Sequence, residues 1–169
     1  MTAFRLRLPQ HQARLVALAV SYHLSRPGSE IDHQTLSEYV HGLAEVLPVI
    51  DVQVDQPAAA VDLNALQAVL LSTAFSSVIS ELKMYSVFDT MSAGSSRPRS
   101  TAPGFDDRLR RLFPEVAGDP AYASQLAEDM AMLRRELPSV RAREVLAEER
   151  RAAREASRRR RKRWQFWKR

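Results

Sequence analysis

The last 31 residues of the chain carry a charge pattern that excludes most of them from a globular core. Residues 139–169 contain 13 Lys and Arg but 4 Glu, a net charge of +9, whereas residues 1–138 have a net charge of −4. Between Leu146 and Trp164 there is no large apolar side chain, so a helix through this stretch has no apolar stripe to bury. We therefore divide the chain into a helical body, residues 1–137, and a basic helical arm, residues 138–169.

The body has the size and apolar content of one globular domain. Single domains usually contain about 100–150 residues, and 45% of this chain is hydrophobic. The chain has no cysteine, which excludes disulfide bonds and thiolate metal sites and fits a reducing compartment. The apolar stretch at residues 15–20 is too short for an export signal, so we expect a cytoplasmic protein.

Apolar residues at intervals of three and four predict a mainly α-helical body. The first predicted helix contains Leu15 and Tyr22 and ends before Pro27, because proline and the glycine after it terminate helices. The longest apolar pattern runs from Asp62, a candidate N-cap, to about Phe88. Its apolar residues cover more than one face, which predicts the central helix of the fold.

Three further helices and a linker complete the predicted body. One helix follows the first, has Ser29 or Asp32 as its cap, and carries an apolar stripe formed by Leu36, Tyr39, Leu43 and Val46. A short helix spans residues 105–113, and a longer one spans residues 119–137 and ends before a proline. Residues 90–104 are rich in Ser, Thr, Pro and Gly and predict a flexible linker.

Two segments alternate between apolar and polar residues, as strands with one buried face do. They are residues 4–8 and residues 50–55. We expect these segments to pair as a small two-stranded ribbon. Two strands alone are marginally stable in water, so such a ribbon has to lean on the helices.

The tip of the arm, residues 158–169, combines eight cations with three aromatic residues and has no acid. Arginine forks match phosphate oxygens, and flat aromatic rings stack on unpaired bases. The tip therefore predicts binding of RNA or single-stranded DNA with little sequence preference. The predicted contacts are Arg158, Arg159, Arg160, Arg161, Lys162, Arg163, Trp164, Phe166, Trp167, Lys168 and Arg169.

The same residues leave alternative partners open. Trp and Phe also settle at bilayer interfaces, and a basic cluster is attracted to an anionic membrane surface. An acidic protein is a third partner, including the acidic body of a second copy in a homo-oligomer, and a solubilising extension is the simplest alternative. Eleven of the 13 arm cations are arginine, which slightly favours bidentate pairing with phosphate.

The sequence predicts no reaction centre. Glu38, His41 and Glu45 share one helix face and form half of a di-metal carboxylate motif, but no second Glu-x-x-His occurs, so we predict no metal site. The chain also lacks the nucleophile-elbow, phosphate-loop and dinucleotide-binding motifs. We expect a non-enzymatic protein without a cofactor.

Overall fold

The computed structural model describes residues 3–26, 42–91, 102, 104–119 and 121–166, with the backbone alone for residues 87–91 and 159–166. The fold is mainly helical with a two-stranded antiparallel sheet, as predicted. In chain order the elements are β1 Phe4–Pro9, α1 Gln10–Ser25, η2 Leu43–Glu45, α2 Val46–Asp51, β2 Ala58–Leu63, α3 Ala65–Met91, α4 Phe105–Leu112, α5 Glu115–Gly118, α6 Tyr122–Glu136 and α7 Ser139–Phe166.

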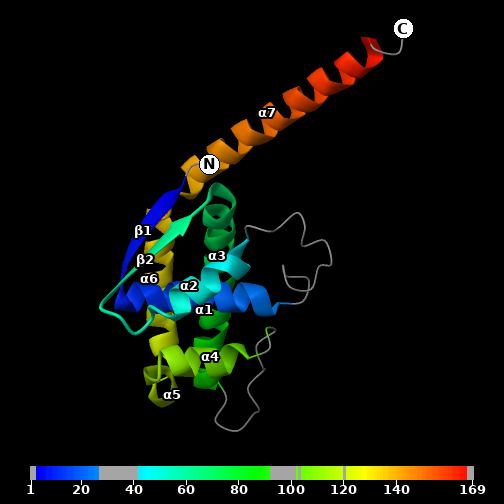
Figure 1. Cartoon of the computed structure of the whole chain (residues 1–169). Coiled ribbons are helices and arrows are strands. Elements are labelled where there is room, and N and C mark those ends of the chain that lie inside the picture. Colours follow the sequence, from blue (N-terminus) through cyan, green and yellow to red (C-terminus); the bar gives the residue numbers. More distant parts are fainter. Residues whose placement is uncertain (1–2, 27–41, 92–101, 103, 120, 167–169) are drawn as a thin grey trace.

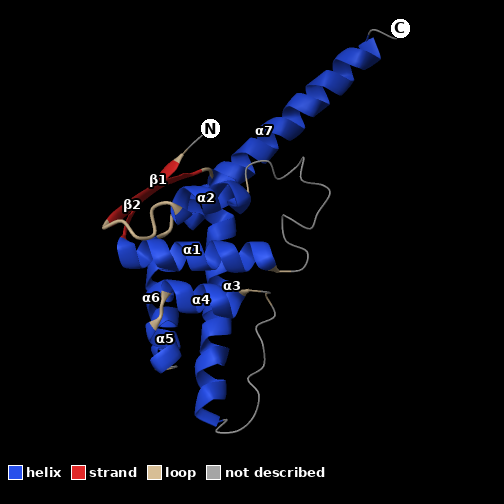
Figure 2. Ribbon diagram, turned by 60° about the horizontal axis from the view of Figure 1, so that its bottom comes forward, coloured by secondary structure: helices blue, strands red, loops and turns tan. Residues whose placement is uncertain are grey.

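Helix α3 is the centre of the body, which confirms the central helix predicted from the sequence. In Figures 1 and 2, α1 crosses it and α6 runs alongside it, and both helices pack against it. Leu71, Phe75, Val78 and Leu82 of α3 are fully buried. Residues 65–86 would be long and apolar enough to cross a membrane, but half of the most apolar stretch is buried, as in the core helix of a folded domain.

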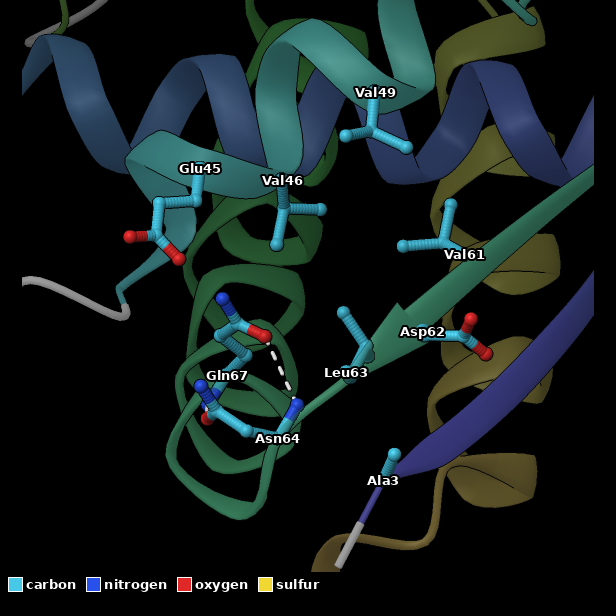
Figure 3. Close-up of a pocket in the computed structure, with 9 residues that line it drawn as sticks. All are labelled: Ala3, Glu45, Val46, Val49, Val61, Asp62, Leu63, Asn64 and Gln67. Atoms are coloured by element: carbon cyan, nitrogen blue, oxygen red, sulfur yellow. Dashed lines mark hydrogen bonds between the residues drawn. The ribbon is translucent and has the colours of Figure 1, made fainter. Parts of the chain in front are cut away.

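The N-cap of α3 is Asn64, so the prediction of Asp62 as the cap is wrong. The Asn64 Oδ1 accepts a hydrogen bond of 2.9 Å from the backbone N–H of Gln67. In return, the Gln67 Oε1 accepts one of 2.9 Å from the backbone N–H of Asn64 (Figure 3). This reciprocal pair is a capping box. Asp62 is still within β2, where its side chain faces Arg5 across the ribbon at 3.8 Å.

The two-stranded ribbon exists, but the prediction of its second strand at residues 50–55 is wrong. β1 pairs with Ala58–Leu63 in an antiparallel register that sets Phe4 opposite Leu63. Ile50 and Val54 are both buried at helical spacing, whereas Val52 between them is 74% exposed. The alternation therefore comes from a helix end and the turns that follow it. The true strand alternates too, but its alanines are weak markers of a strand.

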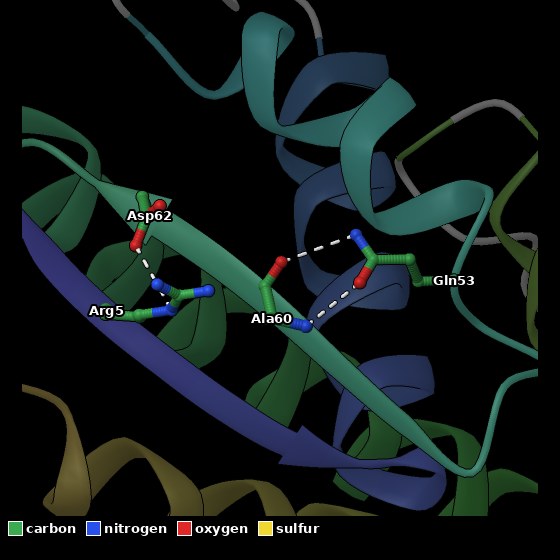
Figure 4. Close-up of polar contacts among 4 residues, drawn as sticks. All are labelled: Arg5, Gln53, Ala60 and Asp62. Atoms are coloured by element: carbon green, nitrogen blue, oxygen red, sulfur yellow. Dashed lines mark hydrogen bonds and ion pairs between the residues drawn. The ribbon is translucent and has the colours of Figure 1, made fainter.

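The free edge of β2 is covered by a side chain from the turn after α2. The amide of Gln53 accepts a hydrogen bond of 2.9 Å from the backbone N–H of Ala60 and donates one of 3.3 Å to the carbonyl of Ala60 (Figure 4). Gln53 thus satisfies the N–H and C=O of Ala60, two of the groups with which a third strand would pair. An uncovered edge is prone to pair with other chains.

The shorter helices agree with their predictions only in part: α6 begins at Tyr122 rather than at residue 119, and Leu43 and Val46 fall in two separate elements instead of one helix. α1 ends at Ser25, α4 ends before Pro114, and α6 buries the stripe that contains Leu126, Met130 and Leu133. Leu43 and Val46 fall in η2 and α2, as shown by the element bounds. The other parts of the predicted second helix, Ser29, Asp32, Leu36 and Tyr39, lie outside the described residues, as does most of the linker 90–104.

Helix α7 begins directly after Pro138, and only its first turns join the core. Ala142 is fully buried, and Val145 and Leu146 are partly buried against the hydrophobic core. Helix α7 packs on α3 through this base. From there the helix leaves the body and extends away from it in both views (Figures 1 and 2). The direction of the arm is therefore set by apolar packing at its base.

Candidate functional site

The exposed length of α7 is the largest feature of the molecule that core packing does not explain. From Ala147 to Arg158 every residue is exposed. The helix continues to Phe166, so the part beyond Leu146 contains 20 residues and is about 30 Å long at 1.5 Å per residue. None of the described side chains in residues 147–158 is buried against the body. The acidic body thus leaves these cations available to an external partner.

The charged groups of the described arm are not paired with one another. A charge pair between Arg151 and Glu155 is expected from their spacing of four residues, but no ion pair joins them in the structure. The ion pairs among the described side chains belong to the body: Arg5–Asp62, His11–Asp129, Arg14–Asp55 and Arg108–Asp51. The arm side chains thus extend into solvent without fixing each other.

The residues predicted from the sequence to bind a partner are resolved to different degrees. Arg158 is described in full and is exposed on α7. Residues 159–166 continue the helix backbone, and nothing is described of their side chains. Trp167, Lys168 and Arg169 lie outside the described residues. The structure therefore shows the direction in which the helix backbone enters the tip. The chemistry of the tip follows from its sequence.

One hollow in the body lies between α2 and the end of β2 and has a volume of about 320 Å³ (Figure 3). Its apolar lining comes from Val46, Val49, Val61 and Leu63, and its polar groups are those of Glu45, Asp62, Asn64 and Gln67. The last two are occupied by the capping box of α3. Among the described residues its lining contains no histidine, serine or lysine, and its ionisable groups are the carboxylates of Glu45 and Asp62.

A second, smaller hollow of about 210 Å³ lies where α1, α2 and α4 meet. Asp51 of α2 pairs there with Arg108 of α4. Burial raises the pKa of Asp51, and the positive charge of Arg111 opposes that shift. The Ser21 Oγ and the Arg108 Nε are buried without a hydrogen-bond partner among the described residues. The visible role of the ion pair is to tie α4 to α2.

The described residues contain no group of three or more His, Asp or Glu side chains that could hold a metal ion. Of the three residues weighed as half of a di-metal motif, Glu45 is exposed in η2, and Glu38 and His41 lie outside the described part of the chain. Comparison of the chain with protein-family models, curated proteins and solved structures found no match. The exposed arm is therefore the feature of the described structure from which a function can be inferred.

The sequence analysis missed one arrangement within the arm. It treated the tip as the binding element and the middle as a solvated connector. In the structure the middle is a continuous helix, and several of its arginines recur at intervals of four residues. That interval was the signal in the sequence that could have found the arrangement, because residues four apart share a helix face.

Proposed function

We propose that the chain is a non-enzymatic binding protein that holds nucleic acid, RNA or single-stranded DNA, on its basic arm with little sequence preference. The observation that carries the proposal is the full exposure of residues 147–158 on a helix that leaves the body. A concentration of like charge raises the local potential and costs free energy unless an anion is nearby. A helix that keeps its cations away from its own acidic body is suited to an external polyanion.

The chemistry of the tip supports a nucleic acid as that polyanion. Eight cations in residues 158–169 neutralise phosphates and release counterions on binding. Trp164, Phe166 and Trp167 offer stacking faces to unpaired bases, each worth roughly 1–3 kcal/mol. Neither interaction depends on which base is present. This is why the proposed binding has little sequence preference.

The middle of the arm argues against a membrane as the main partner. A helix that lies in a bilayer interface needs an apolar face along its length. Residues 147–163 contain no large apolar side chain, so only the aromatic residues of the tip could enter a bilayer. An acidic protein partner would be held by charge alone along the same stretch.

The test compares the intact chain with a variant that ends at residue 157. The truncation removes the eight cations and three aromatics of the tip and changes the net charge from +5 to −3. The core stays intact because the removed residues lie beyond the packed base. Binding is measured to single-stranded RNA and DNA, to duplex, and to anionic and neutral vesicles. We expect the intact chain to bind nucleic acid and the truncated chain to lose most of that affinity.

Two results would overturn the proposal. One is an intact chain that binds no nucleic acid but sediments with anionic vesicles, which would assign the arm to membranes. The other is a truncated chain that binds nucleic acid as tightly as the intact one, which would remove the tip from the interaction. Neutral vesicles control for binding by the aromatic residues alone.

A further inference from the structure

The cations in the middle of the arm include a set confined to one side of the helix. Arg150, Arg154 and Arg158 follow each other at intervals of four residues, and Arg143 precedes them by seven. With 3.6 residues per turn, these intervals place all four on one face, and we call them the arginine row. All four side chains are exposed.

The four acidic residues of the arm lie on other sides of the helix. Glu144, Glu148 and Glu155 share a face that is turned about 110° around the helix from the arginine row, and Glu149 lies on the side that faces the body. That side is turned by about the same angle in the other direction, and its apolar residues are Ala142, Val145 and Leu146. The arginine row is therefore turned away from the core, and of its members only Arg158 has an acid, Glu155, three or four residues away.

This separation works against the stability of the isolated helix. Like charges four residues apart destabilise a helix by roughly 0.2–0.5 kcal/mol per pair, and the row contains two such pairs, joined at Arg154. An acidic residue in place of Arg154 would replace both repulsions with attractions to Arg150 and Arg158. The described structure has no ion pair that offsets the repulsion within the row. A bound row of anions would offset it.

The row matches an anionic partner that is itself straight and stiff. It is about 22 Å long, and its three C-terminal arginines are spaced by about 6 Å of helix rise. Duplex nucleic acid presents continuous rows of phosphates and is stiff over far more than this length. The base of α7 is already packed on α3, and a duplex is already stiff. Neither partner therefore loses much conformational entropy on binding. A single strand would have to be straightened to make the same contacts.

We propose that the arginine row is a second binding surface, which takes the phosphate backbone of a double-stranded segment. The inference rests on the proposed function and deepens it. The tip stacks on unpaired bases, and the middle of the arm lies against an adjoining duplex. The ligand class is then a nucleic acid with a duplex next to unpaired nucleotides.

The test is a charge exchange that leaves the net charge of the chain unchanged. The double variant Glu144→Arg/Arg154→Glu moves one cation out of the row and one acid into it. The helix is retained, because the carboxylate at position 154 gains attractive partners four residues away on both sides. The matched control is Glu144→Arg/Arg141→Glu, which makes the same exchange with an exposed arginine on another side of the helix. Circular dichroism checks the helix content of both variants.

The expected result is a difference between ligands and between variants. Breaking the row lowers affinity for a blunt duplex by about tenfold and for a single strand by less than about twofold. It also reduces the slope of log affinity against log salt for the duplex by about 0.9 for each phosphate that the variant no longer neutralises. The control variant keeps the duplex affinity of the wild type.

Three outcomes would overturn the arginine row as a duplex surface. They are an unchanged duplex affinity in the row variant, an equal loss for duplex and single strand, and an equal loss in the control. The proposed function fails separately, when the wild-type chain binds no nucleic acid at all. Binding that depends on the tip but ignores the row leaves the proposed function standing and removes this inference alone.

Discussion

The buried amide of Gln67 allows a quantitative test of how the central helix is held. Gln67 is 6% exposed. Its side chain accepts a hydrogen bond of 2.9 Å from the backbone N–H of Asn64 and donates one of 3.2 Å to the carbonyl of Gly42. Gln67→Met keeps the size and shape of the side chain but removes both bonds. The Asn64 N–H then loses this partner and the Gly42 carbonyl keeps only the bond of 3.4 Å from the Glu45 N–H, while the Asn64 side-chain cap remains.

The expected loss follows from the cost of such groups. A buried polar group without a partner costs about 1–3 kcal/mol. Since Asn64 is only partly buried and the Gly42 carbonyl keeps its bond from Glu45, we expect the free energy of unfolding to fall by about 1–3 kcal/mol. For a chain of this size that corresponds to a fall in Tm of about 2–12 °C.

The assay is denaturant unfolding of the full chain, followed by circular dichroism, with the denaturant slope compared between variants. Gln125→Met is the matched control, because Gln125 is exposed on α6. The control should change the free energy of unfolding by less than about 0.5 kcal/mol. A loss for Gln67→Met that is no larger than the loss for the control would refute the reasoning.

The remaining predictions concern the tip, the sheet edge and one carboxylate. Trp164→Ala with Trp167→Ala should weaken single-strand binding more than duplex binding, and equal losses in a binding titration would argue against stacking. Gln53→Leu should cost about 1–3 kcal/mol and speed hydrogen exchange at Ala60; unchanged exchange would contradict the edge cover. Burial raises the pKa of Asp51 in the folded chain, so its contribution to stability is full below the unfolded pKa and is lost as the pH rises through the folded pKa. In pH-dependent unfolding, the stability of the wild type relative to Asp51→Asn should thus fall as the pH rises above about 4, and a rise would disprove the shift.

The helices could be predicted from the sequence because their apolar spacing records burial directly. The stripe of α6 and the pattern of α3 cover the faces that pack together in the body. The second strand could not, because alanine, as at Ala59 and Ala60, favours helices over strands. Ile50 and Val54 were misleading because a helix end followed by turns buries residues four apart, an interval that also fits the two-residue period of a strand.

The sequence shows that the arm has no apolar stripe beyond Leu146, but the direction in which α7 leaves the body (Figure 1) could not be predicted from it. The sequence contains the spacing of the arginine row, yet which side of α7 faces the body depends on the packing of Ala142, Val145 and Leu146 on the core. The tip remains a prediction from residue types. Its proposed contacts with phosphates and bases follow from its arginine, lysine and aromatic residues, and binding experiments test them.

The length of the exposed helix has a consequence for how the two charged halves of the chain coexist. In 0.15 M salt, electrostatic forces decay over about 8 Å, whereas the tip begins well beyond that distance from the packed base of α7. A polyanion held at the tip therefore lies outside the repulsion of the negatively charged body. In the proposed function the arm acts as a spacer, which lets a protein with a negatively charged body approach a negative ligand.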